Sequence, residues 1–237
     1  MWHVRFIGFL ILLSCSTVRP AENQTAVGDD FSPEKMKSLV KPLGEGRFQI
    51  DQVRFSKPKR ELSFPAKVNL RDVLIEYAVV GKIGKLHEAL LSTEVPPTHI
   101  HIAMLLLGTK NLRPKSQERR MPPGQPIDVL LSWEADGETK QARLEDWIIT
   151  EESQRPITRG MWVYSGARIE DGYFTANTNE SIIGIILDID ALVNNPRTGN
   201  ENDEIWFPNE SAIPPVGTPV TVTLKMLDTY QVPGKTN

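Results

Sequence analysis

Most of the chain alternates apolar and polar residues with a period of two, which is typical of β-strands that bury one face. The stretches RFQIDQVRF (47–55), RELSFPAKVNL (60–70) and TPVTVTLKML (218–227) show this pattern. VLIEYAVVG (73–81) and SIIGIILDI (181–189) are almost wholly apolar, which predicts strands in the core. The pattern therefore favours a fold built mainly from strands.

Turn residues divide these strands into hairpins. VLLSWEADGETKQARL (129–144) carries Asp136-Gly137, and MWVYSGARIEDGYFTA (161–176) carries Asp171-Gly172. Such pairs supply the positive φ angles that tight hairpin turns require. We also expect KLHEALLST (85–93) to be the hairpin partner of 73–81, through the turn GKIG. DALVNN (190–195) suggests one helical turn.

One segment has the pattern of a buried helix. PPTHIHIAMLLLG (96–108) has proline at its start, Thr98 as a candidate cap, an apolar body and Gly108 at its end. We predict a helix at about 97–107. The expected fold class is α+β and β-dominated, with antiparallel sheets, hairpins and this one buried helix.

The N-terminal residues have the pattern of an export signal. Arg5 precedes an apolar run that is too short to span a bilayer, and small residues follow it. We assign 1–15 to a signal peptide, 16–45 to a polar tether and 46–230 to a single globular domain. The tether is expected to contain one short helix, with Ser32 as its cap, Pro33 as its first residue and Pro42 at its end. The expected location is outside the cytoplasm, either periplasmic or membrane-anchored.

Cys15 is the only cysteine in the chain. Its place after LLS resembles the lipobox of bacterial lipoproteins, in which the cysteine becomes the lipidated N-terminus. Ordinary cleavage near Ser16 or Ala21, which would discard it, is the alternative. A single cysteine excludes an Fe–S cluster, zinc held by several cysteines, and an internal disulfide.

Charge and composition limit the kinds of binding partner that we expect. The formal net charge is -3, with 40% apolar and 24% charged residues, and there is no basic block. We therefore expect a folded domain and no nucleic-acid partner.

All histidines that follow the signal segment lie in one short window, which suggests a site. His87, Glu88, His99 and His101 are the residue types that bind Zn, Cu, Ni or Fe. In a strand His99 and His101 would share a face, whereas in a helix they would point about 200° apart. Our helix prediction argues against a complete site. The alternative is that these histidines orient loops through hydrogen bonds.

A second candidate site is the acidic segment after residue 187. Asp188, Asp190, Asp203 and Glu204 offer oxygen ligands of the kind that Ca²⁺ prefers. Their order does not match an EF-hand loop, so turns fixed by Asp and Asn side chains are the alternative. Four tryptophans could line a groove, although we favour core packing: Trp133, Trp147, Trp162 and Trp206. Arg119 and Arg120 give the expected loop 111–126 a local positive patch, and with Arg113 they could hold an anionic group, although we favour a solvated loop.

Three of these stretches together resemble a known family. KLHEALLST, HIHIAMLLLG and ALVNNPRTGNENDEIWFPNESAIPPVGTPVTV are similar to the YdjY-type domain of bacterial envelope proteins, and the likeness runs from Phe48 to Leu227. The resemblance implies a secreted or lipid-anchored protein. It implies neither an activity nor catalytic residues.

These observations favour a non-enzymatic envelope protein that binds a ligand, a divalent metal or a protein partner. The alternative is a metal-dependent enzyme that uses the His/Glu cluster, because an imidazole beside a carboxylate can serve acid–base chemistry. No nucleophile stands beside that cluster in the sequence, so an enzyme is the less favoured reading. Contact with a membrane is expected only through lipidated Cys15.

Overall fold

Strands account for most of the regular secondary structure in the described residues, as the alternating pattern predicts. The structure is a computed structural model, and it describes residues 33–109, 124–170 and 173–228. Its helices are α1 (Pro33–Leu39), α2 (Pro97–Leu106) and α3 (Thr175–Asn179), with 3-10 turns at Leu86–Glu88 and Leu144–Trp147. Its strands are β1 (Lys41–Gly44), β2 (Arg47–Ile50), β3 (Val53–Ser56), β4 (Glu61–Val68), β5 (Tyr77–Gly81), β6 (Ala89–Thr93), β7 (Gln125–Ala135), β8 (Glu138–Arg143), β9 (Ile148–Thr150), β10 (Trp162–Tyr164), β11 (Ile169–Glu170), β12 (Tyr173–Phe174), β13 (Ser181–Gly184), β14 (Val193–Asn194), β15 (Trp206–Pro208) and β16 (Pro219–Met226).

Eight strands close into a barrel, a feature that the sequence analysis did not foresee. The order around the barrel is β4–β16–β7–β10–β14–β13–β5–β6, and β6 pairs with β4 to close it. The sheet is mixed, because β5–β6 and β13–β14 are parallel pairs. The prediction of β-dominated structure is thus confirmed, and the prediction of antiparallel sheets alone is wrong.

The expected hairpin between β5 and β6 illustrates the error. Tyr77 pairs with Ala89 and Gly81 with Thr93, so the two strands run in the same direction. The segment 82–88 returns to the start of β5 before the next strand begins, so that β6 runs parallel to β5. Just before β5, the Glu76 N–H donates a hydrogen bond to the carbonyl of Glu88, the residue before β6. The run 190–195, expected as a helical turn, contains β14.

In two strands of the barrel, β4 and β7, one edge pairs with two different strands along its length. β4 pairs with β3 through Glu61–Ser63 and with β6 through Lys67 and Val68. Pro65, which has no N–H to donate, lies between the two pairings, and its carbonyl accepts a 2.6 Å bond from the Thr93 hydroxyl. β7 divides its edge in the same way between β10 and β8.

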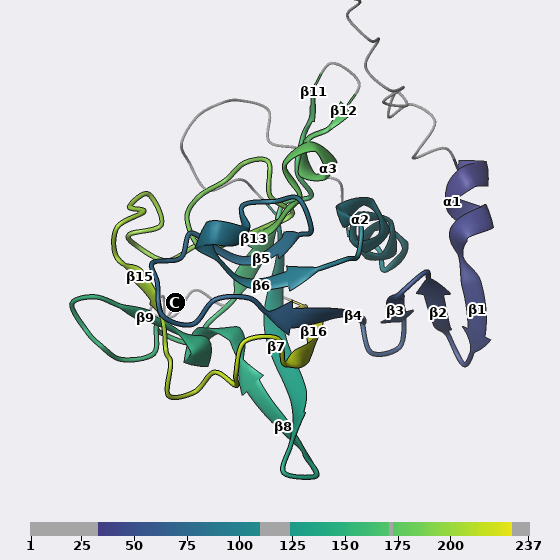
Figure 1. The fold of residues 1–237 in the computed structure, drawn as a ribbon. Helices are drawn as coiled ribbons and strands as arrows, with labels where there is room; N and C mark the ends of the chain where they lie inside the picture. Colours follow the sequence, from purple (N-terminus) through teal and green to yellow (C-terminus); the bar gives the residue numbers. More distant parts are fainter. Residues whose placement is uncertain (1–32, 110–123, 171–172, 229–237) are drawn as a thin grey trace, which may run out of the picture.

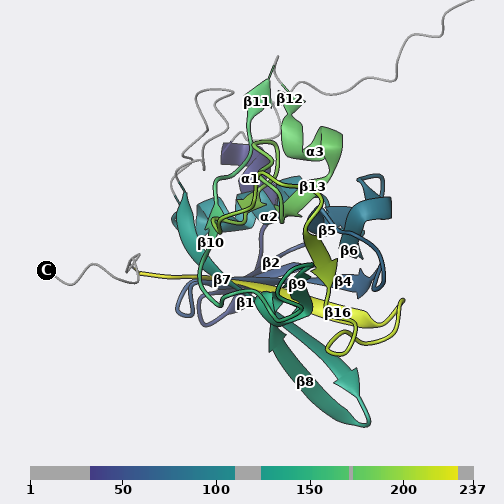
Figure 2. The same cartoon turned by 90° about the vertical axis from the view of Figure 1, so that its left-hand side faces the viewer.

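This sharing attaches an open sheet to the barrel. The strands β4, β16 and β7 belong to the barrel and also to the series β1–β2–β3–β4–β16–β7–β8. Figure 1 shows β1–β3 standing to one side of the barrel and β8 projecting below it. Figure 2, turned by 90°, shows the β7–β8 hairpin extending away from the other strands. Asp136 and Gly137 at its tip have φ angles of 56° and 75°, as predicted for this turn.

The barrel interior is filled by side chains. The inward residues of β4 and β16, such as Leu62, Phe64 and Val222, join one large buried cluster that includes α2. An eight-stranded barrel is about wide enough for its own side chains. Helix α2 matches the predicted helix within one residue and buries Ile100, Ile102 and Met104.

The N-terminal boundary of the domain agrees only in part with the expected one. The short helix of the expected tether is α1, which starts at Pro33. The sheet begins earlier than residue 46, because β1 pairs with β2 from Lys41. The pairing of β11 with β12 is present, although the turn at Asp171-Gly172 lies outside the described residues. Within the described ranges, no helix is long and apolar enough to cross a membrane.

Candidate functional site

The outer face of the open sheet carries a row of side chains that crosses six strands. Cross-strand pairing aligns neighbouring residues from β2 to β8, and paired residues of antiparallel strands lie on the same face. The row is Gln49, Arg54, Ser63, Thr223, Leu130 and Arg143. A second row beside it is Pro65, Thr221, Ser132 and Gln141. The face is therefore rich in hydroxyl and amide groups, with an arginine near each end of the first row.

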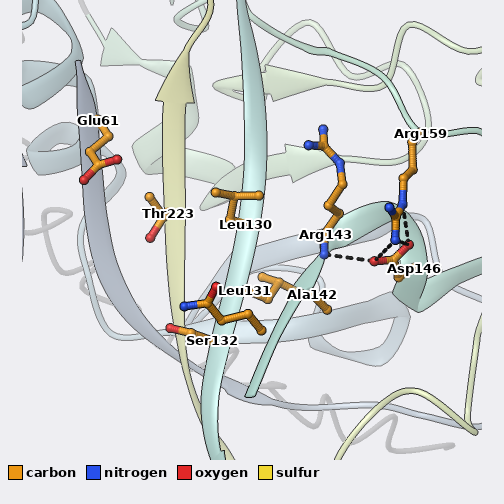
Figure 3. Close-up of a pocket in the computed structure, with 10 residues that line it drawn as sticks. Glu61, Leu130, Leu131, Ser132, Ala142, Arg143, Asp146, Arg159 and Thr223 are labelled. Atoms are coloured by element: carbon orange, nitrogen blue, oxygen red, sulfur yellow. Dashed lines mark hydrogen bonds and ion pairs between the residues drawn. The ribbon is translucent and has the colours of Figure 1, made fainter. Parts of the chain in front are cut away.

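Three hollows lie along this face. The first has a volume of about 430 Å³ and is lined by residues of β4, β16, β7 and β8, among them Glu61, Thr223 and Arg143. Figure 3 shows Glu61, Thr223, Leu130 and Arg143 on four successive strands. The second, of about 470 Å³, includes Ser63 and Thr221, and the third, of about 320 Å³, includes Glu61 and Ser63. Because neighbouring hollows share residues or strands, they form one continuous surface, which we call the row face.

The β8 end of the row face is held by paired charges. Arg159 makes a bidentate pair with Asp146, through bonds of 2.9 and 3.0 Å. The Arg143 guanidinium binds the carboxylate of Asp128, and this bond raises the pKa of Arg143. The Arg143 N–H donates to Asp146 at 3.1 Å, which closes the group. Arg143, Asp146 and Arg159 line the first hollow on this side, as Figure 3 shows.

A buried carboxylate lies close to Arg143. Glu145 is fully buried, and its Oε1 accepts bonds of 3.0 Å from the Arg197 guanidinium and from the Gly160 N–H. Arg143 Nη2 lies 3.4 Å from the same oxygen. Burial lowers the pKa of Arg197, and the charge of Glu145 opposes that shift. Arg197 also lies over the ring of Trp162, at 5.1 Å from its centroid. The network joins β8 to the segment that follows β14.

The structure gives the histidines of the predicted metal site separate partners. His87 is exposed beside Glu88, with Nε2 3.5 Å from its carboxylate. His99 and His101 both belong to α2, and His99 Nδ1 lies 3.7 Å from Asp51 on the loop after β2. Burial lowers the pKa of His99, and Asp51 opposes the shift.

His101 is buried and bonded elsewhere. Its Nδ1 lies 2.6 Å from the hydroxyl of Tyr164, and its ring packs against Phe174. Burial raises the pKa of Tyr164, so the phenol of this pair keeps its proton. Among the residues that the structure describes, no group of three or more His, Cys, Asp or Glu is placed to hold a metal ion. Of the four candidate ligands, His87 and Glu88 are neighbours, whereas His99 and His101 contact other residues.

The predicted calcium ligands also take separate roles. Asp188 accepts a bond of 3.1 Å from the Tyr77 hydroxyl and one of 2.8 Å from the Asp190 N–H. Asp190 in turn accepts a bond of 2.9 Å from Arg168. Asp203 and Glu204 are exposed on the loop before β15. The two aspartates fix turns and hold an arginine, which is the alternative reading of this segment.

The remaining sequence candidates are core residues or lie outside the described ranges. Trp147, Trp162 and Trp206 are buried, and Trp133 packs edge-on against Trp147, which agrees with core packing. Cys15 and the three arginines of the loop, Arg113, Arg119 and Arg120, lie outside the described residues.

Sequence reasoning missed the row face. Its residues occupy the polar positions of alternating runs, such as Ser63 in RELSFPAKVNL and Thr221 and Thr223 in TPVTVTLKML. That alternation predicts which side chains face outward. It does not predict that β16 lies between β4 and β7, which joins segments far apart in the chain.

The fold and this face together define a class of domain: a mixed eight-stranded barrel that shares three strands with an open sheet. The sequence was also compared with models of known protein families. The YdjY domain model matches residues 53–225, and the chain belongs to this family. The match includes every strand of the barrel and most of the open sheet. No curated protein and no solved structure matches the chain.

Proposed function

We propose that the protein is a non-catalytic binding module and that its ligand is an extended polymer lying across the row face. The observation that supports this most is the continuity of the three hollows, because the third hollow shares Glu61 with the first and Ser63 with the second. Small-molecule sites usually enclose most of their ligand. A shallow surface that crosses six strands suits a long ligand that makes many weak contacts.

The chemistry of the row face supports binding over catalysis. Ser63, Thr221 and Thr223 offer hydroxyl groups that donate and accept hydrogen bonds. No base is within hydrogen-bond reach of them among the contacts of the described residues, and Glu61 pairs with Lys59 at 3.6 Å. An activated hydroxyl nucleophile needs such a base. A metal-dependent enzyme that uses the four His/Glu residues has no matching cluster in the described part of the chain.

The proposal includes a location in the bacterial envelope. It rests on the apolar run after Arg5 and on the lipobox-like position of Cys15, both read from the sequence. An exported protein meets the polymers of the envelope, which include polysaccharides and extended protein segments. The polymer that this module binds is therefore expected to be an envelope component.

The test blocks the row face with a bulky residue. Thr223→Trp fills the first hollow, and Thr139→Trp makes the same change at an exposed position of β8 that lines none of the three hollows. We expect the parent and Thr139→Trp to sediment with an isolated bacterial envelope fraction, and Thr223→Trp to stay in solution. Circular dichroism melting checks that both variants are folded. Equal sedimentation of a folded Thr223→Trp, or no sedimentation of the parent, would refute the proposal.

A further inference from the structure

The row face carries charged side chains of both signs. The residues that line the three hollows include five basic side chains, Arg47, Arg54, Lys59, Arg143 and Arg159, and three acidic ones, Asp51, Glu61 and Asp146. Four of these basic residues are ion-paired: Arg47 with Glu45, Lys59 with Glu61, Arg143 with Asp128 and Arg159 with Asp146. Arg54 is the basic lining residue that has no ion pair among the described residues, and an exposed guanidinium of this kind favours a ligand with negative charge.

Arg54 is the residue best placed to bind that charge. It lines both the second and the third hollow, and it is exposed on β3 between Gln49 and Ser63. Within the described residues Arg54 has no ion pair, whereas Arg143 and Arg159 at the other end are engaged by carboxylates. A guanidinium without a carboxylate partner can bind a ligand carboxylate through two hydrogen bonds.

The polar groups around Arg54 fit a sugar polymer better than a peptide. An extended peptide gains affinity mainly by pairing its backbone with a free sheet edge. The central strands β4 and β16 are paired on both sides, so the middle of the row face offers side chains only. Its Ser, Thr and Gln side chains match the hydroxyl groups of a sugar, which also donate and accept.

From these observations we propose that the ligand is a carboxylated polysaccharide and that Arg54 binds its carboxylate. This inference rests on the proposed binding function of the row face. Arg54 and Arg143 are separated by four strand spacings, or about 19 Å at about 4.8 Å per spacing. A pyranose ring is about as long as one spacing, so about four sugar units would cover the row. Affinity is therefore expected to rise with oligomer length up to about four units and then to level off.

The experiment measures binding of the purified full chain by isothermal titration calorimetry. The probes are oligogalacturonates of two to eight units, with maltohexaose as a neutral oligosaccharide and hexaglutamate as an acidic peptide. Arg54→Gln is compared with Arg155→Gln, which makes the same change at an exposed arginine that lines none of the three hollows. We expect oligogalacturonate to bind the parent, about tenfold weaker binding by Arg54→Gln, and no change for Arg155→Gln.

Each other outcome overturns the inference in a distinct way. Equal binding of maltohexaose, or an Arg54→Gln variant that binds like the parent, would rule out a ligand carboxylate bound by Arg54. In that case the row face remains the proposed binding site if Thr223→Trp still abolishes binding. Tighter binding of hexaglutamate than of oligogalacturonate assigns the face to acidic peptides. If oligogalacturonate does not bind while the parent still sediments with envelopes, the ligand class is wrong and the proposed function is unaffected.

Discussion

The buried carboxylate of Glu145 provides a quantitative test of how the β8 end of the row face is held. Its side chain has 0% exposure, and its partner Arg197 has 14%. Glu145→Gln keeps the shape and an oxygen for the Gly160 N–H, but it leaves the Arg197 guanidinium largely buried without a counter-charge. Removing one partner of a buried ion pair typically costs about 3–5 kcal/mol. For a domain of this size that corresponds to a fall in Tm of about 6–20 °C.

The assay is urea unfolding of the parent, the two single variants and the double variant Glu145→Gln/Arg197→Gln. Because each single change leaves its partner unpaired, the double variant should lose about 2 kcal/mol less than the sum of the single losses. Arg159→Gln is the matched control, since Arg159 has 67% exposure in its pair with Asp146. An exposed pair should cost less than about 1 kcal/mol.

Two results would refute this reasoning. A Glu145→Gln loss no larger than that of Arg159→Gln would show that burial does not strengthen the network. Strict additivity in the double variant would show that Glu145 and Arg197 do not stabilise each other.

Three further predictions concern single contacts. Tyr164→Phe should lower the free energy of unfolding by about 1–3 kcal/mol, because it removes the hydroxyl bonded to buried His101, and urea unfolding measures the loss. Gly81→Ala should destabilise by about 1–3 kcal/mol, because its Cβ would clash with the Glu180 carboxylate and lie 2.7 Å from the Glu180 Cβ; a loss that Glu180→Gly does not reduce would contradict this cause. Burial and the charge of Glu88 raise the pKa of Glu76, so the folded state holds its proton more tightly than the unfolded state. Stability should therefore fall as the pH rises from the usual Glu value of 4.5 through the raised pKa, and Glu76→Gln should flatten that decline in thermal melts; an unchanged slope would exclude Glu76 as its source.

The elements that sequence patterns predict well are those specified by local interactions. Helix α2 begins at Pro97 because proline fixes its own φ angle at a helical value. The β7–β8 turn falls at Asp136-Gly137 because this pair readily adopts the positive φ angles that the turn requires. The strands β4 and β16 follow from alternation alone. These features need no knowledge of what lies beside them.

Pairing between distant strands was not predictable in the same way. β5 and β6 were expected to form a hairpin because they are close in sequence, but both are buried strands, and such runs carry no mark of direction. Barrel closure depends on the edge of β4 changing partners near Pro65, a property of three segments at once. The histidine window failed as a cluster for a related reason. A helix directs His99 toward β2 and His101 toward Tyr164, so closeness in sequence does not give a shared site.

The ion network and the row face meet at Arg143, and this connection makes the two ends of the row different. Arg143 is fixed by Asp128 and lies near Glu145, whereas Arg54 is exposed and has no ion pair among the described residues. A fixed arginine loses little conformational entropy when a ligand binds. Because the charge of Arg143 is already balanced by Asp128, we expect it to orient an anionic ligand more than to attract it. Arg54 contributes attraction and must be ordered by the ligand. Asp128→Asn should therefore release charge at the β8 end and tighten the binding of an anionic oligosaccharide, while Arg54→Gln weakens it. If Asp128→Asn weakened binding as much as Arg54→Gln, the ligand would depend on the position of Arg143 rather than on free positive charge.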